Sequence, residues 1–347
     1  MISIIGGGPA GNYLAALLAK NGKQVCVYEE HNEIGKPVQC AGVVTSDLDK
    51  FVKVDGFLVN KINKFKVFLE NNETEVKLKT NYIVDRAKFD SYLAKKAMEY
   101  GAEYKLGWKF LGFENGQLKF NKGLRKTDIL VGADGPFSTV AKKTGLYGNR
   151  KFAIAAQITC RKKVDKNVIG LHFGEGYFGW VIPETGNKVR VGVGVNDNVS
   201  YYLNKFLDKI GVKGKNFQSG FIPVYDPKAK LCKKNVYLLG DAALQVKPTS
   251  GGGILQGLMA AQELSRAILY GLDYTKLCKK RFGLDLYLSL MIRKKLDKFT
   301  KKDFDYAFKL VNNPKIMKIL ETQDRDYAGK ILFKALLKEP RFLKLLF

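Results

Sequence analysis

Three glycine-rich stretches, far apart in the chain, carry residue types that bind phosphate groups and nucleotides. Residues 6–11 read Gly-Gly-Gly-Pro-Ala-Gly, residues 132–135 read Gly-Ala-Asp-Gly, and residues 240–254 run from Gly-Asp to three glycines and an isoleucine. Glycine lets a backbone approach a phosphate closely, and the free N–H groups at a helix start attract the anion. We therefore expect a nucleotide site to which all three stretches contribute.

The first stretch lies between a short apolar strand, residues 2–5, and a helix that we expect over residues 12–20. Its spacing is Gly-x-Gly-x-x-Gly. In such a turn the first glycine allows the tight bend, the second lets a pyrophosphate approach the backbone, and the third lets the helix pack against the strand. The cofactor-binding residues expected here are Gly6, Gly8, Pro9, Ala10 and Gly11.

An acidic residue follows the second expected strand, residues 24–28. Glu29 stands about 20 residues after the glycine motif, where a carboxylate can hydrogen-bond the ribose of a dinucleotide. Glu30 is the alternative for this role. The motif by itself predicts a dinucleotide without separating FAD from NAD, and a purely structural glycine turn is the alternative.

Two aspartates mark the other glycine-rich stretches. Asp134 lies in a turn after an apolar strand that ends at Gly132, where it can orient the backbone; a pure turn role is the alternative. Asp241 follows a strand at residues 236–239 and precedes a helix that we expect over residues 254–269. Strand, Gly-Asp, glycine turn and helix start together make a pocket that favours an anion.

Composition and charge limit the classes of partner that the protein could bind. The chain is 46% hydrophobic, as in a globular protein with a core. Its formal net charge is +26, from 59 Lys and Arg against 33 Asp and Glu. Such a charge is compatible with an anionic membrane surface or an acidic protein. No nucleic-acid-binding motif is present, so we expect no nucleic-acid partner.

The five cysteines are widely spaced and form no Cys-x-x-Cys pair. We therefore expect neither a metal site nor a disulfide framework, and a reducing cytoplasm is the simplest setting. No apolar run approaches the roughly 20 residues that span a bilayer. No secretory leader is recognisable at the N-terminus. We expect a cytoplasmic protein that is soluble or lies on the inner face of the membrane.

Strand-like segments fill the middle of the chain and predict a second sheet. Residues 152–159 are mostly apolar, and residues 189–195 alternate with period two. Between them, residues 176–183 read Gly-Tyr-Phe-Gly-Trp-Val-Ile-Pro. An apolar, aromatic surface suits a long hydrocarbon chain, because burial of apolar area drives binding. Core packing is the alternative for Trp180.

In this order, the three glycine-rich stretches resemble the flavin-binding signature of the FAD-dependent reductases and monooxygenases related to para-hydroxybenzoate hydroxylase. Within that group the pattern is most similar to the geranylgeranyl reductases of archaea and photosynthetic organisms, over roughly residues 1–290. The resemblance implies FAD as the cofactor. It also implies that Asp134 lies beside the pyrophosphate or helps a nicotinamide to approach.

The resemblance extends to two further motifs. Residues 34–42 resemble the family's cysteine-containing loop, which implies that Cys40 and Ala41 lie against the flavin. A small residue that only packs near the cofactor is the alternative for Cys40. Residues 86–90 resemble the family's Arg-x-x-Phe-Asp motif, whose arginine contacts FAD. On physical grounds Arg86 could hold the pyrophosphate or the ribityl side, and a surface arginine is the alternative.

The remaining flavin contacts are also carried by the resemblance. Phe110 comes where the family's adenine-contacting strand comes, which implies a backbone contact there. Asp241 is implied to hydrogen-bond the ribityl chain, and Pro248 to lie near the isoalloxazine. A helix start would point at the flavin N1/C2=O edge and stabilise the anionic reduced flavin. Its amides belong to Gly252, Gly253 and Ile254.

The aromatic segment carries a resemblance of its own. Geranylgeranyl reductases have Tyr-x-Trp-x-Phe-Pro in this place, and flavin-dependent halogenases have Trp-x-Trp-x-Ile-Pro. The segment is read as part of the sheet that covers the flavin and holds the substrate, and the second motif favours the halogenase alternative. The substrate-binding residues so implied are Phe178, Trp180, Ile182 and Pro183.

The C-terminal part is basic and has apolar residues at helical spacing. Residues 271–347 hold 19 Lys and Arg against nine Asp and Glu. The last stretch, residues 331–347, pairs leucines and aromatic residues with lysines, which fits an interfacial helix on anionic lipid. A helical cap with a solvated basic face is the alternative.

We therefore expect an α/β protein with a Rossmann-like FAD-binding domain, an inserted antiparallel β-sheet substrate domain and a helical C-terminus. The FAD-binding domain would comprise residues 1–150 and 230–275, with residues 51–84 contributing to the substrate side. The substrate domain would comprise residues 151–229. A helical basic region would comprise residues 276–347.

The resemblance implies an FAD-dependent reductase of C=C bonds in geranylgeranyl or other polyprenyl lipids, with hydride supplied from flavin N5. Cys40 or a bound water is the candidate proton source. The electron donor is open, since NADPH, ferredoxin or a similar carrier would have to dock transiently. One alternative is a flavin monooxygenase or halogenase. Another is a non-catalytic flavoprotein that passes electrons to lipid or quinone.

Overall fold

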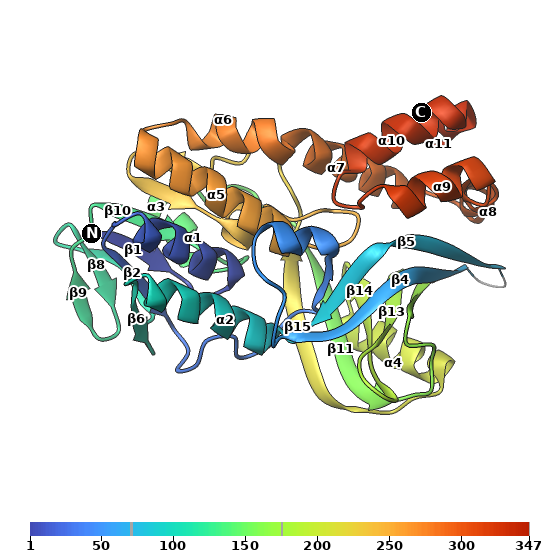
Figure 1. The fold of residues 1–347 in the computed structure, drawn as a ribbon, viewed down its shortest axis with the longest axis horizontal. Coiled ribbons are helices and arrows are strands. Elements are labelled where there is room, and N and C mark those ends of the chain that lie inside the picture. Colours follow the sequence, from blue (N-terminus) through green and yellow to red (C-terminus); the bar gives the residue numbers. More distant parts are fainter. Residues whose placement is uncertain (70–71, 175, 347) are drawn as a thin grey trace. The chain divides into compact units, whose positions relative to one another are not determined.

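In the computed structural model the chain alternates between two units, each built from three separate segments (Figure 1). The first unit comprises Met1–Val38, Asp85–Lys151 and Ile222–Leu286. The second unit comprises Gln39–Val84, Phe152–Phe221 and Tyr287–Phe347. Within these ranges the structure describes residues 1–69, 72–174 and 176–346.

The first unit is built on a mostly parallel six-stranded sheet with the order β16-β17-β10-β1-β2-β6. β1, β2, β6, β10 and β17 are parallel, and β16 pairs antiparallel with β17. Four-residue apolar runs such as β1 are buried along their whole length, as parallel strands covered on both faces require. The strands are β1 (Ile2–Ile5), β2 (Val25–Glu29), β6 (Glu103–Leu106), β10 (Ile129–Gly132), β16 (Cys232–Lys233) and β17 (Val236–Leu238).

Helices and a small meander cover this sheet. α1 packs on β1 and β2 and contacts α2 and α5, whereas α3 contacts β7, β10 and β17. The meander β7-β8-β9 joins the same core as β2, since the rings of Tyr28 and Phe120 stack with centroids 4.3 Å apart. The helices are α1 (Pro9–Lys20), α2 (Arg86–Glu99), α3 (Thr139–Thr144), α5 (Ile254–Tyr270) and α6 (Tyr274–Cys278), with the 3₁₀ turn η2 (Gly240–Ala243) and the π-helical η3 (Lys279–Gly283). The meander strands are β7 (Phe110–Glu114), β8 (Gln117–Phe120) and β9 (Gly123–Arg125).

The second unit is built on an eight-stranded sheet with the order β15-β11-β14-β13-β12-β4-β5-β3. β4 pairs parallel with β12, whereas the pairs β11–β14, β12–β13, β13–β14, β3–β5 and β4–β5 are antiparallel. The strands are β3 (Val43–Thr45), β4 (Leu58–Leu69), β5 (Asn72–Val84), β11 (Phe152–Arg161), β12 (Val168–Gly174), β13 (Tyr177–Pro183), β14 (Lys188–Val195) and β15 (Lys215–Pro223).

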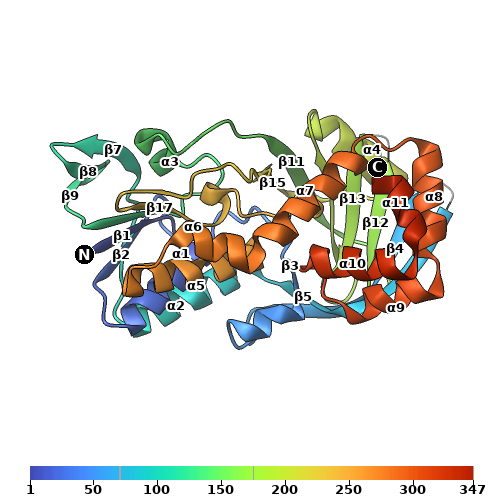
Figure 2. The ribbon, with the colours of Figure 1, turned by 90° about the horizontal axis from the view of Figure 1, so that it is seen from above.

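Different helices cover the two faces of this sheet. On one face α4 buries Leu203 and Phe206 against the valines of β14, which alternate with period two along the strand. On the other face lie the C-terminal helices: α9 contacts β5, and Phe304 of α8 contacts Phe173 of β12 with ring centroids 6.2 Å apart (Figure 2). The remaining elements are η1 (Ser46–Lys50), α4 (Val199–Ile210), α7 (Leu284–Leu296), α8 (Lys301–Val311), α9 (Pro314–Thr322), α10 (Ala328–Lys338), η4 (Pro340–Phe342) and α11 (Leu343–Leu346).

The predicted fold class is confirmed, with small shifts at the ends of elements. The first helix begins at Pro9 rather than at residue 12, because proline at the first helical position needs no hydrogen bond for its missing N–H. The strand predicted over residues 236–239 ends at Leu238. None of the helices in the described ranges is long and apolar enough to cross a membrane.

Candidate functional site

The glycines of the first turn have distinct surroundings. A Cβ atom on Gly6 would lie 2.3 Å from the carbonyl oxygen of Ala133, and one on Gly11 would lie 2.2 Å from the carbonyl oxygen of Gly6. Gly6 also has a φ of +107°, which favours glycine. A Cβ on Gly8 would meet nothing within 4 Å. The first and third glycines are therefore fixed by packing, and the second borders open space.

The start of α1 faces this space. Gly8 is the N-cap and supplies no side-chain hydrogen bond, and Pro9 and Ala10 form the first turn. The buried Asn12 fixes the loop, because its Nδ2 donates to the carbonyl oxygens of Gly7 at 2.7 Å and of Asp90 at 3.1 Å. Our reading of the sequence missed Asn12; a lone amide among the apolar residues of this helix was the available signal.

Glu29 ends β2, as predicted for the ribose-binding acid. Its Oε2 accepts a hydrogen bond from the Gly7 amide at 2.7 Å, and its Oε1 accepts one from the His31 amide at 3.0 Å. The carboxylate therefore holds the glycine turn, and its contact with a ribose stays a prediction. Glu30 instead pairs with Lys109 at 2.9 Å.

Arg86 opens α2 and forms a two-pronged ion pair with Asp90, with Nε–Oδ1 at 3.1 Å and Nη2–Oδ2 at 3.0 Å. Burial raises the pKa of Asp90, and the Arg86 charge opposes that rise. Asp85 caps the helix by accepting from the Lys88 amide. The same guanidinium opposes the rise in the pKa of Asp241 that burial causes, so Arg86 lies within electrostatic reach of the Gly-Asp turn.

Asp134 acts as a cap for α3. Its Oδ1 accepts from the Ser138 hydroxyl at 2.6 Å and its Oδ2 from the Val140 amide at 3.0 Å. Burial raises the pKa of Asp134. Arg150 then ties this turn to the Gly-Asp turn, because it donates to the carbonyl oxygens of Pro136 at 3.0 Å and of Ala242 at 2.8 Å.

The Gly-Asp turn presents its carboxylate without a protein partner. Gly240 and Leu244 flank the turn with φ angles of +65° and +59°. The side chain of Gln245 fixes this turn. Its Oε1 accepts a hydrogen bond from the Gly240 amide at 2.8 Å, and its Nε2 donates one to the Tyr274 hydroxyl at 3.0 Å. Burial raises the pKa of Asp241 to about 6. Among the residues that the structure describes, none donates a hydrogen bond to this carboxylate, so it can accept one from a ligand hydroxyl.

A tight loop leads from this turn to α5. The Lys247 amide donates to the Gly252 carbonyl oxygen at 3.0 Å, and the Gly251 amide donates back to Lys247 at 2.9 Å, so Pro248 lies at the tip. Gly253 is the N-cap of α5, which begins at Ile254, and it offers no side-chain cap. A Cβ on Gly253 would lie 3.2 Å from Asp241 Oδ1. The helix start and the aspartate therefore border one small volume.

Phe110 lies in the meander rather than in the parallel sheet. It begins β7, is 4% exposed, and its ring meets that of Phe120 edge-on with centroids 5.7 Å apart. The backbone contact with adenine that the resemblance implied for Phe110 stays a prediction.

In the second unit an aromatic face lies opposite α4. Gln157, Gly192 and Trp180 stand directly across from one another on β11, β14 and β13. Residues paired in this way point to the same face of a sheet. A Cβ on Gly192 would lie 2.6 Å from Trp180 Cζ2, so the indole crosses β14 where no side chain intervenes.

Three of the four predicted substrate residues share this face. Phe178 and Trp180 lie two apart on β13 with ring centroids 6.2 Å apart, and Ile182 follows in the same direction. Phe173, on β12, adds a ring 5.3 Å from Phe178. Pro183 alternates to the opposite face, where it is buried beside Val189.

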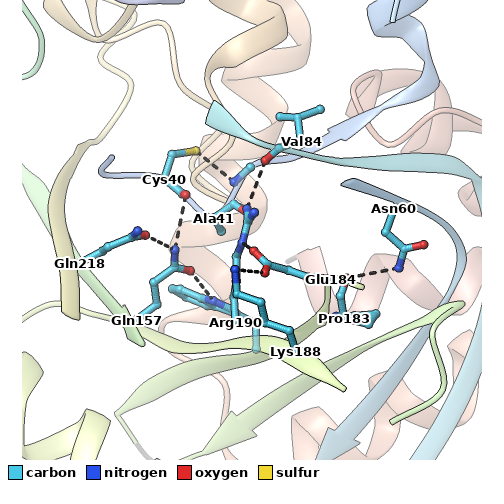
Figure 3. A network of polar contacts seen from close by, with 12 residues as sticks. Cys40, Ala41, Asn60, Val84, Gln157, Pro183, Glu184, Lys188, Arg190 and Gln218 are labelled. Carbon is cyan, nitrogen blue, oxygen red and sulfur yellow. Dashed lines mark hydrogen bonds and ion pairs between the residues drawn. The ribbon is translucent and has the colours of Figure 1, made fainter. Parts of the chain in front are cut away.

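The Cys40–Ala41 segment is held by side chains of the same sheet (Figure 3). Arg190 Nη1 donates to the Ala41 carbonyl oxygen at 2.6 Å, and Gln157 Nε2 contacts the Cys40 carbonyl oxygen at 3.4 Å. The Cys40 thiol is half-buried and accepts from the Gly42 amide at 3.4 Å. Sequence reasoning identified Cys40, Ala41 and Trp180 but neither polar residue that links them.

No three His, Cys, Asp or Glu side chains in the described residues are grouped so that they could hold a metal ion. The cysteines are free thiols, of which Cys40 and Cys232 are half-buried and the others buried.

Comparison with known proteins defines the class. Residues 4–48 match the model of an NAD(P)-binding Rossmann-like domain. A geranylgeranyl bacteriochlorophyll reductase-like protein from Thermoplasma acidophilum has the same fold, with a TM-score of 0.84, 22% identity and coverage of 99% of this chain and 98% of that one. A flavin-dependent brominase superposes with a TM-score of 0.71 at 17% identity, covering 98% of each chain. The fold is that of FAD-binding flavoproteins.

Sequence relatives narrow the class further. The digeranylgeranylglycerophospholipid reductase of Methanococcus aeolicus is 27% identical, over 99% of this chain and 96% of its own length. Digeranylgeranylglycerophospholipid reductase 2 of Methanothermobacter thermautotrophicus is 29% identical, over 99% of this chain and 98% of its own. The chain is thus homologous over nearly its full length to these reductases, and the resemblance inferred from the motifs is confirmed.

Proposed function

We propose that the protein is an FAD-dependent oxidoreductase that reduces C=C bonds in the geranylgeranyl or polyprenyl chains of membrane-lipid precursors. The observation that carries the proposal is a half-buried aromatic face beside a cysteine loop held by Arg190, in a chain that also has a glycine turn of the dinucleotide-binding type. Nearly full-length similarity to the curated reductases supports the lipid class.

The first unit is the proposed FAD-binding domain. The open space at Gly8 and the α1 start would receive the pyrophosphate, and Glu29 would face the adenosine ribose. Asp241 would accept from a ribityl hydroxyl, because its carboxylate has no protein donor among the described residues. When bound, FAD supplies hydride from its N5 position. Asp134, Phe110 and Arg86 complete the proposed cofactor set.

The α5 start has the electrostatics that a reduced flavin needs. Gly252, Gly253 and Ile254 precede or open a 17-residue helix whose first N–H groups have no side-chain cap. The helix dipole places partial positive charge at this end, worth roughly 0.3–1 kcal/mol toward an anion at an exposed site. Pro248, at the loop tip, would border the isoalloxazine.

The aromatic face of the second unit is the proposed binding surface for the isoprenoid chain. Phe178 and Trp180, both half-buried, supply apolar area without a charge, and Ile182 next to them is buried in the core. Burial contributes about 25 cal/mol per Å² of apolar surface. An isolated alkene is a poor electrophile, so close approach in a dry site matters more than polarisation. Cys40 is the candidate proton source, with bound water as the alternative.

The basic C-terminal helices are a proposed contact with anionic lipid at the inner face of the cell membrane. In α10, Phe333 and Leu337 are 66% and 65% exposed, whereas Ile331 and Ala335 pack inward. Lysines 330, 334 and 338 flank the exposed pair. Apolar side chains framed by lysines are typical of interfacial helices. The electron donor would be NADPH or a reduced carrier that docks transiently.

The proposal is tested by mass spectrometry of a geranylgeranylated glycerophospholipid after anaerobic incubation with the dithionite-reduced FAD protein. We expect a gain of two hydrogens per reduced double bond. An unchanged lipid from a protein whose flavin is bound and reducible would contradict the proposal. Oxygen consumption with hydroxylated or halogenated product would instead indicate the monooxygenase or halogenase alternative.

A further inference from the structure

A buried ion pair in the second unit, Arg190 with Glu184, contacts the loop that carries Cys40. Arg190, on β14, is 8% exposed, and its Nε contacts Glu184 Oε1 at 2.5 Å. Its Nη1 donates to the carbonyl oxygens of Ala41 at 2.6 Å and of Val84 at 3.3 Å. One guanidinium therefore joins a loop, a strand end and a carboxylate, and Figure 3 shows these groups converging.

A second side chain, that of Gln157, contacts the neighbouring carbonyl group of Cys40. Gln157 is 5% exposed, and its Nε2 reaches the Cys40 carbonyl oxygen at 3.4 Å and Gln218 Oε1 at 2.7 Å. Its Oε1 accepts from the Trp180 indole N–H at 3.2 Å. Gln157 thus uses both ends of its amide, one toward the aromatic face and one toward the cysteine loop.

Strand register explains why these groups meet. Gln157, Gly192 and Trp180 form one row across β11, β14 and β13, and Thr159, Arg190 and Ile182 form the next row. Residues that face each other across neighbouring strands point to the same side of the sheet. Arg190 and Gln157 therefore lie on the same face of the sheet as Trp180 and Ile182.

We infer that Arg190 and Gln157 are positioning residues of the reductase site, which hold the Cys40–Ala41 backbone against the face that carries Trp180. The loop has no regular secondary structure between residues 30 and 42, and these two side chains contact its carbonyl groups at Cys40 and Ala41. Buried carbonyl groups keep their partners, because an unpaired one is costly. The inference rests on the proposed function, since it makes the cysteine and the aromatic wall parts of one substrate site.

Glu184 has a supporting role in this arrangement. Its carboxylate pairs with Arg190 and with Lys188, the latter at 2.7 Å, and these cations hold the pKa of Glu184 below its ordinary value. The negative charge of Glu184 balances the positive charge of Arg190, whose guanidinium is buried away from water. Removing either partner alone would leave a buried charge, which is strongly destabilising. Gln157 is therefore the safer site for a test.

Alkylation of Cys40 measures the position of the loop independently of turnover. The FAD-loaded protein is treated with iodoacetamide, and peptides are quantified by mass spectrometry. Cys232, half-buried in the first unit, is the internal reference, because Cys26, Cys160 and Cys278 are buried. For Gln157→Met we expect the Cys40/Cys232 ratio of alkylation rates to rise about tenfold, the change that corresponds to one net hydrogen bond.

Asn60→Ala is the matched control. Asn60 Nδ2 donates to the carbonyl oxygens of Lys166 at 2.8 Å and of Pro183 at 3.2 Å, so the variant loses side chain-to-backbone bonds in the same unit without touching the cysteine loop. Its Cys40/Cys232 ratio should match that of wild type. Arg190→Met should raise the ratio, and Arg190→Lys should restore part of the difference, since a lysine still donates to one carbonyl.

Steady-state kinetics distinguish a positioning role of these residues from a general loss of folding stability. With a geranylgeranyl lipid, Gln157→Met should lower kcat while KM stays within about twofold of wild type, because the apolar face still binds the chain. A wild-type ratio of alkylation rates in both Gln157→Met and Arg190→Met, with both proteins folded, would overturn the inference. Failure of wild-type protein to reduce the lipid would contradict the proposed function alone, because the alkylation result does not depend on it.

Discussion

The indole of Trp180 lies across Gly192, at a position where a Cβ on the glycine would be 2.6 Å from Trp180 Cζ2 and 2.5 Å from Gln157 Cβ. Gly192→Ala should therefore displace the indole and lower the rate of lipid reduction. Overpacking of this kind costs about 1–3 kcal/mol of folding stability. Steady-state kinetics and urea unfolding measure the two effects.

Gly194→Ala is the control for this variant. A Cβ on Gly194 would lie 3.8 Å from Trp180 Cζ3, which is ordinary van der Waals contact. We expect near wild-type stability and activity. Equal loss of activity in both variants would show that the indole position at Gly192 is not what matters.

Asp241 offers a test in which stability and cofactor binding change in opposite directions. Its folded pKa of about 6 lies above the ordinary aspartate value of 3.8, so ionisation in the folded apoprotein is penalised and stability falls as the pH rises through 6. Asp241→Asn should therefore stabilise the apoprotein at pH 7 by up to about 3 kcal/mol. Urea unfolding of flavin-free protein at pH 4.5 and pH 7 measures this.

Binding of FAD, in contrast, should weaken when the Asp241 carboxylate is removed. Asp241→Ala removes a charged acceptor, whose hydrogen bonds are worth about 1.5–3 kcal/mol, so FAD should bind roughly 10- to 100-fold more weakly. Equilibrium dialysis measures the affinity. A full flavin complement in the purified variant would remove Asp241 from the cofactor site.

His172 makes the second unit sensitive to acid. Its ring stacks on Phe68 with centroids 4.3 Å apart and meets Phe206 at 5.1 Å. Burial, aided by the charge of Lys209, lowers the pKa of His172 to about 4. Because the folded pKa lies below the unfolded value near 6.5, the stability from neutral His172 is present above pH 6.5 and is lost as the pH falls toward 4.

His172→Phe should remove this dependence. Between pH 7 and pH 4.5 the wild-type protein should lose about 2 kcal/mol more unfolding free energy than the variant. The buried Nδ1, which has no hydrogen-bond partner in the described residues, would also disappear. Parallel curves of unfolding free energy against pH for the two proteins would contradict the assignment.

The exposed side of α10 allows the membrane proposal to be tested without disturbing the fold. Deletion of residues 331–347 would remove Ala335 and Phe342 from the cluster around Ile316, so point substitutions are preferable. Phe333→Ser with Leu337→Ser should weaken binding to vesicles of phosphatidylglycerol and phosphatidylcholine roughly 10- to 100-fold. Co-sedimentation measures the bound fraction.

Tyr270→Ser is the control for vesicle binding, because Tyr270 is 70% exposed at the end of α5 in the first unit. It should bind vesicles as wild type does. The double variant in α10 should keep its thermal midpoint, since both replaced side chains face solvent. Undiminished sedimentation of that variant would remove the proposed contact.

The local geometry of the glycine turn could be predicted from the sequence alone. Gly6, Gly8 and Gly11 have the expected surroundings, because a turn between adjacent elements is set by residues that are neighbours in the chain. Glu29 and Asp241 likewise stand where a strand of the sheet ends. The period-two alternation of β14 also predicted its sheet.

Only the tertiary structure decided which distant residues meet. Gln157 and Arg190 lie more than 100 residues from the Cys40 loop, and no local pattern marks them as its donors. Alternation tells which residues share a face, but strand order and register decide which carbonyl lies within reach of a side chain.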